Sequence, residues 1–370
     1  MRFTCSTQQL IERLQIVTKA ISARTTNPAL EGILVETERD NIVLTCSDER
    51  ITIVTRMQAE IKEAGRGIVP GKMFSEIVRR LPEDSVTISM NERMVFNIRS
   101  GSSKSNLSGM DADLFPQLPQ LDDVNEIALP QDMLRDMIQK TEFAIATEDA
   151  REVLTGSFLE IKNGTVSMVA LDGYRLALKR DTCGDAVKEL SAIIPGRAIG
   201  DIGKLLSDKE DAFAVLSFSG NKLHIRLEDT EIFIILISGE YIDYHRILPA
   251  EFATRVTVEL EPLRRCIDRA ALFARDGNNN LLVLRIHDGT LVIEAHSQIG
   301  DVHEELYTEQ EGADLNIAFN VRYMTDVVRY IDAERIELKM NSPIAPCIIS
   351  PVGDPDYLHL VLPVRTGATN

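Results

Sequence analysis

Apolar residues recur at helical spacing in places that match one another along the chain. The first such helix face consists of Leu10, Leu14, Val17 and Ile21. A matching face lies 124 residues later, at Leu134, Ile138, Thr141 and Ile145. A third lies a further 129 residues on, at Leu263, Ile267, Ala270 and Ala274. One apolar quartet is weak evidence, but three in a near-constant spacing indicate an internal repeat.

A second helix face repeats in the same way. Its first copy is Phe74, Ile77, Val78 and Leu81. Copies spaced by 125 residues follow at Ile199, Ile202, Gly203 and Leu206, and then at Met324, Val327, Val328 and Ile331. The two faces together predict six helices, over residues 9–24, 71–80, 131–146, 196–206, 261–275 and 321–331.

Strand and turn signals follow the same repeat. Four residues that belong to predicted strands and turns, Leu30, Gly32, Glu36 and Asp48, recur 124 positions later as Leu154, Gly156, Glu160 and Asp172. The stretch 171–178, L-D-G-Y-R-L-A-L, places an Asp-Gly pair between apolar runs and predicts a hairpin. Units of this length are domains, because solenoid repeats reach only about 50 residues. We expect an α+β protein of three similar domains, 1–124, 125–250 and 251–370, each with two helices against antiparallel sheet.

Composition narrows the class of protein. The five cysteines are odd in number and form no C-x-x-C pair, which favours reduced cytosolic thiols over a disulfide framework or zinc site. No apolar run reaches 18 residues, and the first residues lack the apolar core of a signal peptide. We therefore expect a cytoplasmic protein that does not enter a membrane.

The net charge of −17 argues against nucleic-acid binding only if the charge is evenly spread. The six predicted helices carry a combined charge of +7, so the rest of the chain carries −24. One interpretation is a basic helical face that attracts a polyanion; the other is that Lys and Arg simply favour helices. A basic face would contact phosphates without reading sequence, and no motif for base recognition is present.

Domain size limits how such a chain could hold DNA. A domain of this length has a diameter of ~35 Å, and three in a closed ring leave a hole only ~5 Å wide. Six leave a hole of ~35 Å, which admits a duplex roughly 20 Å thick. A head-to-tail dimer could therefore encircle DNA, whereas a monomer could not.

Several stretches resemble the bacterial DNA polymerase III beta subunits, the sliding clamps of replication. They are A-R-T-T-N-P-A-L-E-G-I-L (23–34), L-D-G-Y-R-L-A (171–177), I-I-P-G-R (193–197), G-E-Y-I-D-Y-H-R-I-L-P (239–249), F-N-V-R-Y (319–323) and L-V-L-P-V-R (360–365). The resemblance covers essentially the whole chain. It implies a clamp arc that dimerises into a six-domain ring with helices lining the hole, no catalysis and no cofactor.

The resemblance also implies partners. They are duplex DNA, a second copy of the chain, the DNA polymerase III catalytic subunit, an ATP-driven clamp loader, and other polymerases and repair proteins that carry short apolar peptides. The alternative is a three-domain interaction scaffold that does not encircle DNA.

By resemblance, partner peptides insert into a pocket between the second and third domains. The positions that match are Leu154, Leu171, Gly173, Tyr174, Arg175, Leu176, Ile242, Arg246, Ile247, Asn320, Tyr323, Leu360, Leu362, Pro363, Val364 and Arg365. Without the resemblance, the same residues could form ordinary domain packing. Ile242 stands where the family usually has Pro, and the tail Thr366–Asn370 extends past the family's usual end.

The resemblance further implies contacts with DNA and with the second copy. The DNA-facing positions would be Arg24, Lys72, Arg79, Arg80, Lys140, Arg151, Arg197, Lys204 and Arg275, although each could equally be a solvated helix charge. The dimer positions would be Lys104, Leu107, Leu272 and Phe273, with Ser105 in place of an expected aromatic residue.

No pattern predicts an enzyme. The six histidines show no metal-ligand spacing, so no metal site is expected. Motifs for a serine nucleophile, a phosphate-binding loop or a dinucleotide fold are also missing from the sequence. Asp172 near Arg175 is better explained by turn chemistry than by acid–base catalysis.

Overall fold

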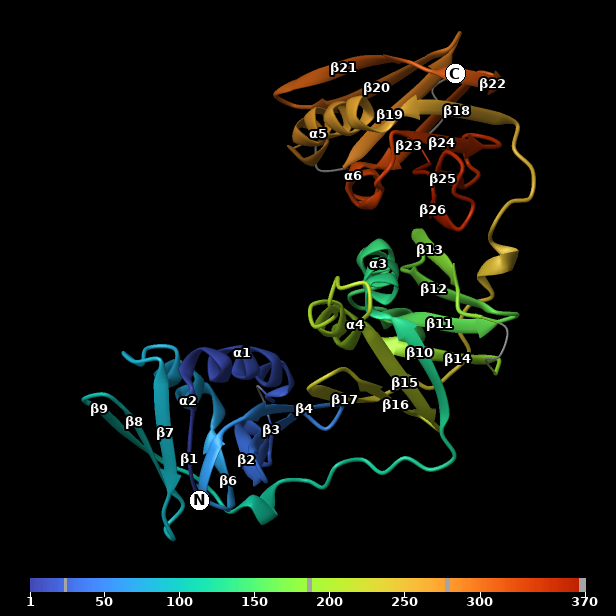
Figure 1. Cartoon of the computed structure of the whole chain (residues 1–370). Helices are drawn as coiled ribbons and strands as arrows, with labels where there is room; N and C mark the ends of the chain where they lie inside the picture. The colour runs from blue at the N-terminus through green and yellow to red at the C-terminus, as the bar shows by residue number, and fades with distance from the viewer. Residues whose placement is uncertain (23–24, 185–187, 277–279, 366–370) are drawn as a thin grey trace. The chain divides into compact units, whose positions relative to one another are not determined.

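The computed structural model describes residues 1–22, 25–184, 188–276 and 280–365. Its element order repeats three times within these ranges: a strand, a helix, four or five strands, a second helix and three strands (Figure 1). The three repeats begin at β1, β10 and β18 and confirm the predicted α+β class.

The helices occupy the predicted places. They are α1 (Thr7–Val17), α2 (Gly71–Val78), α3 (Gln131–Thr141), α4 (Gly196–Gly203), α5 (Leu260–Asp276) and α6 (Val321–Tyr330). The first and third end earlier than the apolar spacing predicts, because 3₁₀ turns η1 (Thr18–Ala20) and η4 (Glu142–Ala144) follow them. At both ends a threonine hydroxyl donates to a helix carbonyl, Thr18 to Leu14 (2.6 Å) and Thr141 to Met137 (2.7 Å).

Most of the apolar helix positions are buried, as the spacing predicts. In α5, all four repeat positions are fully buried, and so are all four in the region of α6. Ile21, Ile77, Leu81 and Ile145 are only partly buried. The faces that define the repeat are therefore the faces that form the cores.

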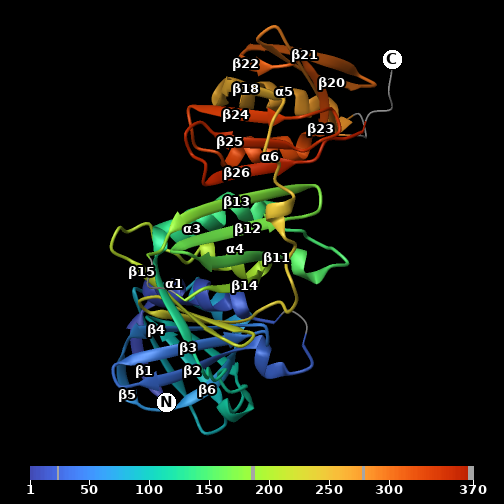
Figure 2. The same ribbon diagram turned by 90° about the vertical axis from the view of Figure 1, so that its right-hand side faces the viewer.

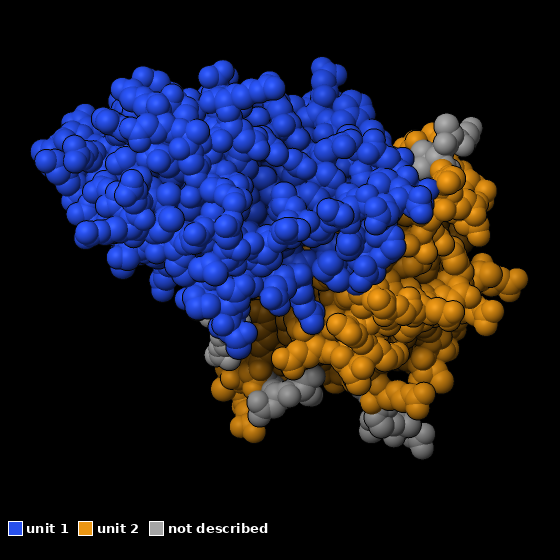
Figure 3. Space-filling model, turned by 90° about the horizontal axis from the view of Figure 1, so that it is seen from below, with its two compact units in different colours: residues 1–132, 204–236 blue, residues 133–203, 237–370 orange. Residues whose placement is uncertain are grey.

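The chain divides into two compact units, coloured separately in Figure 3. The first contains residues 1–132 and 204–236, and the second contains residues 133–203 and 237–370. The central repeat is thus shared, because three of its strands follow the first repeat and the others follow the third.

Unit 1 contains two antiparallel sheets. In spatial order, the five-stranded sheet is β5 (Glu60–Glu63), β1 (Arg2–Ser6), β7 (Ser85–Met90), β8 (Val95–Ser100) and β9 (Ser103–Ser108). The eight-stranded sheet is β10 (Asn125–Pro130), β15 (Phe213–Ser219), β16 (Lys222–Arg226), β17 (Thr230–Ile235), β4 (Ile51–Gln58), β3 (Asn41–Ser47), β2 (Gly32–Glu38) and β6 (Arg66–Pro70).

Unit 2 has the same plan. Its nine-stranded sheet runs β14 (Leu190–Pro195), β11 (Gly156–Lys162), β12 (Thr165–Leu171), β13 (Arg175–Thr182), β26 (Tyr357–Val361), β25 (Cys347–Pro351), β24 (Arg335–Met340), β18 (Thr254–Glu259) and β22 (Glu309–Gly312). Its four-stranded sheet runs β21 (Gly300–Tyr307), β20 (Thr290–Ser297), β19 (Leu281–His287) and β23 (Leu315–Asn320).

Each large sheet joins strands of two repeats. In unit 1, β17 pairs with β4, and Ile232 lies opposite Ile53. In unit 2, β13 pairs with β26, and Leu176 lies opposite Leu360 (Figure 2). Main-chain hydrogen bonds therefore continue from one repeat to the next, so neighbouring repeats are held as one sheet.

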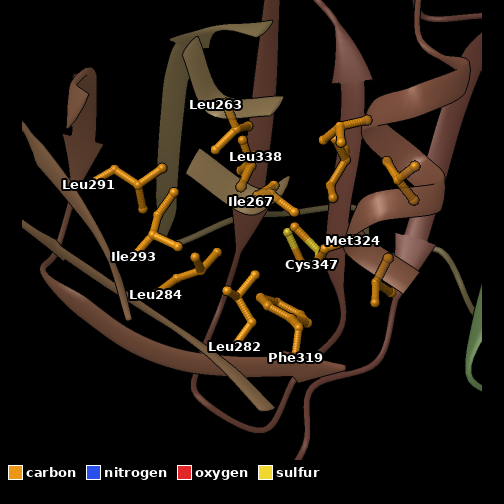
Figure 4. Close-up of a cluster of buried hydrophobic side chains, with 14 of the residues drawn as sticks. Leu263, Ile267, Leu282, Leu284, Leu291, Ile293, Phe319, Met324, Leu338 and Cys347 are labelled. Atoms are coloured by element: carbon orange, nitrogen blue, oxygen red, sulfur yellow. The ribbon is translucent and has the colours of Figure 1, made fainter. Parts of the chain in front are cut away.

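The largest described core lies in unit 2 around α5 and α6. Leu263 and Ile267 of α5 and Met324 of α6 meet Leu282 and Phe319 from the four-stranded sheet (Figure 4). All of these side chains are fully buried, so both helices are fixed against the sheet by apolar packing.

Candidate functional site

The stretch 171–178 forms the predicted hairpin between β12 and β13. Gly173 adopts φ +87°, a conformation that glycine accepts without steric cost. The Asp172 carboxylate accepts hydrogen bonds from the backbone N–H groups of Tyr174 and Arg175, each at 3.0 Å. Asp172 and Gly173 thus shape the turn, as sequence chemistry indicates.

Arg175 begins β13 and is only 7% exposed. Its guanidinium donates to Asp172 (3.1 Å), to the Asp326 carboxylate of α6 and to the carbonyl oxygen of Phe143 (2.6 Å). The charge is therefore balanced by two carboxylates, and the side chain ties the central repeat to α6. A guanidinium suits this position because its donors are arranged in a planar fork.

Aromatic rings cover the same arginine. The Arg175 guanidinium carbon lies 4.8 Å from the Tyr323 ring centre and 5.4 Å from that of Phe143. Tyr323 in turn stacks with Tyr174 at 6.1 Å, and Tyr174 remains 61% exposed. Burial raises the pKa of Tyr323, and the nearby Asp172 carboxylate raises it further. The two tyrosines thus present a neutral aromatic surface beside the hairpin.

The C-terminal segment continues alongside this surface. After β26, the N–H of Leu362 donates to the carbonyl of Tyr174 (2.8 Å), and the N–H of Val364 donates to the carbonyl of Ala318 (2.7 Å). Two main-chain bonds therefore hold residues 362–365 against both the hairpin and β23. Val364 and Arg365 are exposed, and Pro363 is partly exposed.

An apolar cluster lies behind the hairpin and contains many of the positions that the resemblance suggests. Leu154, Leu171, Leu176 and Leu360 are buried in it, whereas Ile242, Ile247 and Leu362 are only partly buried at its edge. Ile242, which replaces the family's usual Pro, packs on this cluster. The result is an apolar floor with a partly open margin, which is the composition of peptide-binding grooves.

Two of the suggested residues have local roles. Asn320 caps α6, since its side-chain oxygen accepts the N–H of Arg322 at 2.9 Å. Arg246 lies in the 3₁₀ turn η6 (Tyr244–Arg246), is 87% exposed and pairs with Asp243 at 2.9 Å. Arg246 is thus available at the surface, whereas the side-chain oxygen of Asn320 is already used.

Sequence reasoning did not assign a role to four residues that help build this site. Asp326 and Phe143 bind Arg175. Tyr241 stacks on Phe158 at 4.9 Å and joins the apolar cluster. The aromatic residues of the 239–249 stretch were a usable signal for Tyr241, but nothing local links residue 175 to residues 143 and 326.

Comparison with known proteins agrees with this architecture. The models of the DNA polymerase III beta subunit match consecutive parts of the chain: the N-terminal domain at 1–119, the central domain at 128–243 and the C-terminal domain at 245–365. The beta sliding clamp of Staphylococcus aureus is 34% identical over 376 aligned positions, covering 99% of this chain and 100% of the relative. The chain belongs to the DNA polymerase III beta subunit family.

Solved structures extend the likeness to the fold. The DNA polymerase sliding clamp from Bacillus subtilis has a TM-score of 0.95 and 31% identity over 99% of this chain and 100% of its own. The beta subunit of Streptococcus pyogenes has a TM-score of 0.94 and 26% identity with the same coverage. The three-domain sliding-clamp fold and the family resemblance are confirmed, and the function is that of a sliding clamp.

As in the family, basic residues stand on the helices and the turns after them. Lys72 and Arg197 are exposed in first turns of helices, Lys204 is exposed just after α4, and Arg275 is exposed at the end of α5. Arg79, Arg80, Arg151 and Lys140 form ion pairs with nearby acidic side chains. Lys140 is only 21% exposed and also lies 5.1 Å from the Tyr357 ring, so it is the least accessible of them. Arg24 lies outside the described residues.

The beta-subunit dimer positions lie near sheet edges in both units. Lys104 and Leu107 belong to β9, the edge of the five-stranded sheet, where Lys104 is exposed. In α5, Leu272 is 69% exposed, while Phe273 packs on the core and approaches Gly300 at the start of edge strand β21. Unpaired edges are templates for strand addition by another chain.

Searches for other kinds of site gave nothing further. Within the described ranges, no group of three or more His, Cys, Asp or Glu side chains is placed to hold a metal ion. No described helix is both long and apolar enough to cross a membrane.

Proposed function

We propose that this sliding clamp encircles duplex DNA as a head-to-tail homodimer and does not act as an enzyme. The observation that carries the proposal is the three-domain clamp fold at a TM-score of 0.95. Two copies supply six domains, enough for a hole of ~35 Å. The proposed domain limits are 1–124, 125–250 and 251–370, with the protein acting on cytoplasmic DNA.

The dimer joins edge strands, with Lys104 and Leu107 of one copy meeting Leu272 and Phe273 of the next. Lys104 lies on a strand without acidic residues, whereas β21 carries Asp301, Glu304 and Glu305. This opposite charge supports pairing of unlike edges, which turns a three-domain arc into a ring rather than a two-fold sandwich.

The DNA contacts are phosphate contacts from Arg24, Lys72, Arg79, Arg80, Lys140, Arg151, Arg197, Lys204 and Arg275. Contacts of this kind bind without regard to sequence and allow sliding. The excess of acidic residues elsewhere disfavours DNA binding on other surfaces.

The site around Arg175 binds short apolar peptides of the DNA polymerase III catalytic subunit, the clamp loader, other polymerases and repair proteins. It is supported by the apolar cluster with its partly open margin, by the exposed Tyr174 ring and by the exposed Val364. A peptide there would bury apolar side chains on the cluster and bond to the hairpin margin.

Retention on circular DNA tests the ring. Loaded onto closed circles and washed in moderate salt, the clamp should remain bound, and it should be lost when the circle is cut once. Equal loss from closed and cut circles contradicts encirclement. No retention even with a loader present favours the alternative of a three-domain interaction scaffold without a DNA role.

A further inference from the structure

A groove of about 950 Å³ lies in unit 1 beside the first turn of α2. One wall is the segment from Pro28 to Gly32, and the other is α2 from Gly71 to Arg79. Met73, which is 55% exposed, and Met110 supply apolar surface. The pocket around Arg175 in unit 2 shares no residue with this groove.

Ser75 lines the groove and is only 5% exposed. Its hydroxyl has no hydrogen-bond partner. Side chains of a helix lean toward its N-terminus, so Ser75 lies above Gly71 and Lys72 on the preceding turn. A buried hydroxyl without a partner is costly, and native proteins usually satisfy such groups. This hydroxyl is therefore a donor that awaits a ligand.

The start of α2 adds further donors. Pro70 is the N-cap residue and provides no side-chain acceptor for the first-turn N–H groups. Those groups and the helix dipole favour an anion. Lys72 is exposed and forms no hydrogen bond or ion pair with any described residue.

The corresponding place in the third repeat is closed to a ligand. At α6, the Asn320 side chain accepts the N–H of Arg322 (2.9 Å), and the Thr325 hydroxyl donates to the Val321 carbonyl (2.8 Å). Thr325 is the repeat counterpart of Ser75 and Asn320 that of Pro70, since both pairs are 250 residues apart. The first repeat thus leaves open the donors that the third repeat satisfies internally.

Acidic side chains set the limits of the site. Glu76 is paired with Arg79 (3.4 Å) and with Arg80, so its charge is largely balanced. Glu31 is exposed on the opposite wall and would repel an anion that approached it. An anion is therefore favoured on the Ser75 side of the groove, and the methionines can contact an apolar group attached to it.

We propose that this groove binds one phosphodiester of the DNA duplex, with the Ser75 hydroxyl, the first-turn N–H groups of α2 and the Lys72 ammonium as donors. A phosphodiester provides both the anionic oxygens and an apolar sugar edge for Met73. The inference rests on the proposed function, because the duplex is the anion that a ring would hold next to its helices.

The test measures binding of a short fluorescent duplex by anisotropy in low salt. Ser75→Ala should weaken binding about fivefold, the loss of one hydrogen bond to a charged group. Thermal stability should stay the same or rise, because an unsatisfied buried hydroxyl is removed. The matched control is Thr325→Ala, which removes a hydroxyl that is already satisfied and should leave duplex affinity unchanged.

Charge variants separate this site from general attraction. Lys72→Gln should weaken binding and reduce the salt slope by about 0.9, whereas Ser75→Ala should weaken binding at every salt concentration with the slope unchanged. Glu31→Gln should strengthen binding.

Equal affinity of Ser75→Ala and wild type overturns the phosphate site, and so does equal weakening by Thr325→Ala. A groove that serves an apolar peptide instead would leave duplex binding unaffected by all three groove variants. Retention of wild type on circles in the same preparation shows whether only this site has failed or the clamp function as well.

Discussion

His359, in β26, is fully buried, and neither of its ring nitrogens has a hydrogen-bond partner. Its ring lies 4.7 Å from that of Tyr357 and 5.5 Å from that of Phe143. Burial lowers its pKa to about 3, and the Arg175 charge adds to the effect. The side chain thus sits as a neutral ring at the junction where β26 meets β13.

This burial predicts acid lability. As pH falls below 6.5, the unfolded chain binds a proton at His359, whereas the folded chain does not until about pH 3. Stability from this group is complete above pH 7 and declines as pH falls, by about 2 kcal/mol at pH 5. His359→Phe should flatten the decline in urea unfolding between pH 7 and pH 5. His296→Gln, at an exposed position, is the control; an equally steep decline in both variants contradicts this role.

Arg175 supports a second residue-scale prediction. Lysine keeps the charge but cannot bind Asp172, Asp326 and the Phe143 carbonyl together. Arg175→Lys should therefore destabilise unit 2 by about 2 kcal/mol and weaken an apolar partner peptide about tenfold. Thermal unfolding and fluorescence titration measure the two effects. Wild-type peptide affinity in a folded Arg175→Lys variant would show that the arginine does not organise the site.

At the scale of elements, the six helices and the threefold order could be predicted because burial imposes a 3.6-residue period. The ends of α1 and α3 could not, since threonine hydroxyls that bond to helix carbonyls compete with apolar spacing. The turn at Asp172–Gly173 was predictable from local chemistry. Arg175's contacts with Phe143 and Asp326 were not, because they depend on how separate elements pack.

The C-terminal segment offers an element-scale prediction. Deletion of Leu362–Arg365 with the residues after it removes two main-chain bonds that hold the segment on the hairpin and β23. Peptide affinity should fall at least about tenfold, while the dimer persists because its proposed edges lie elsewhere. A chain that ends after Arg365 is the matched control. Unchanged peptide affinity in the longer deletion would remove this segment from the site.

At the scale of the whole molecule, three domains could be predicted but their division into two units could not. The division arises because β17 pairs with β4 and β13 pairs with β26. Edge strands carry no local mark of which neighbour they will join, so sequence alone leaves these pairings open. Ion pairs such as Arg56 with Glu231 (2.6 Å), across the β4–β17 pairing, are hidden for the same reason.

Dimerisation gives a prediction at this scale. Leu272→Glu places a charge on an exposed apolar position and should convert the dimer to monomers in sedimentation experiments without a loss of thermal stability. Ile344→Glu is the control, because Ile344 is similarly exposed at 66% but lies outside the proposed interface. Retention of the dimer in Leu272→Glu, or its loss in the control, contradicts the proposed edge contact.

The most direct measurement of encirclement is the lifetime of the clamp on linear DNA whose ends are blocked by bound protein. If the ring is threaded, blocking the ends should restore the long lifetime seen on closed circles, and release of the blocks should shorten it at once. A lifetime that is the same with open and blocked ends would show that the clamp is held by surface contacts and not by encirclement.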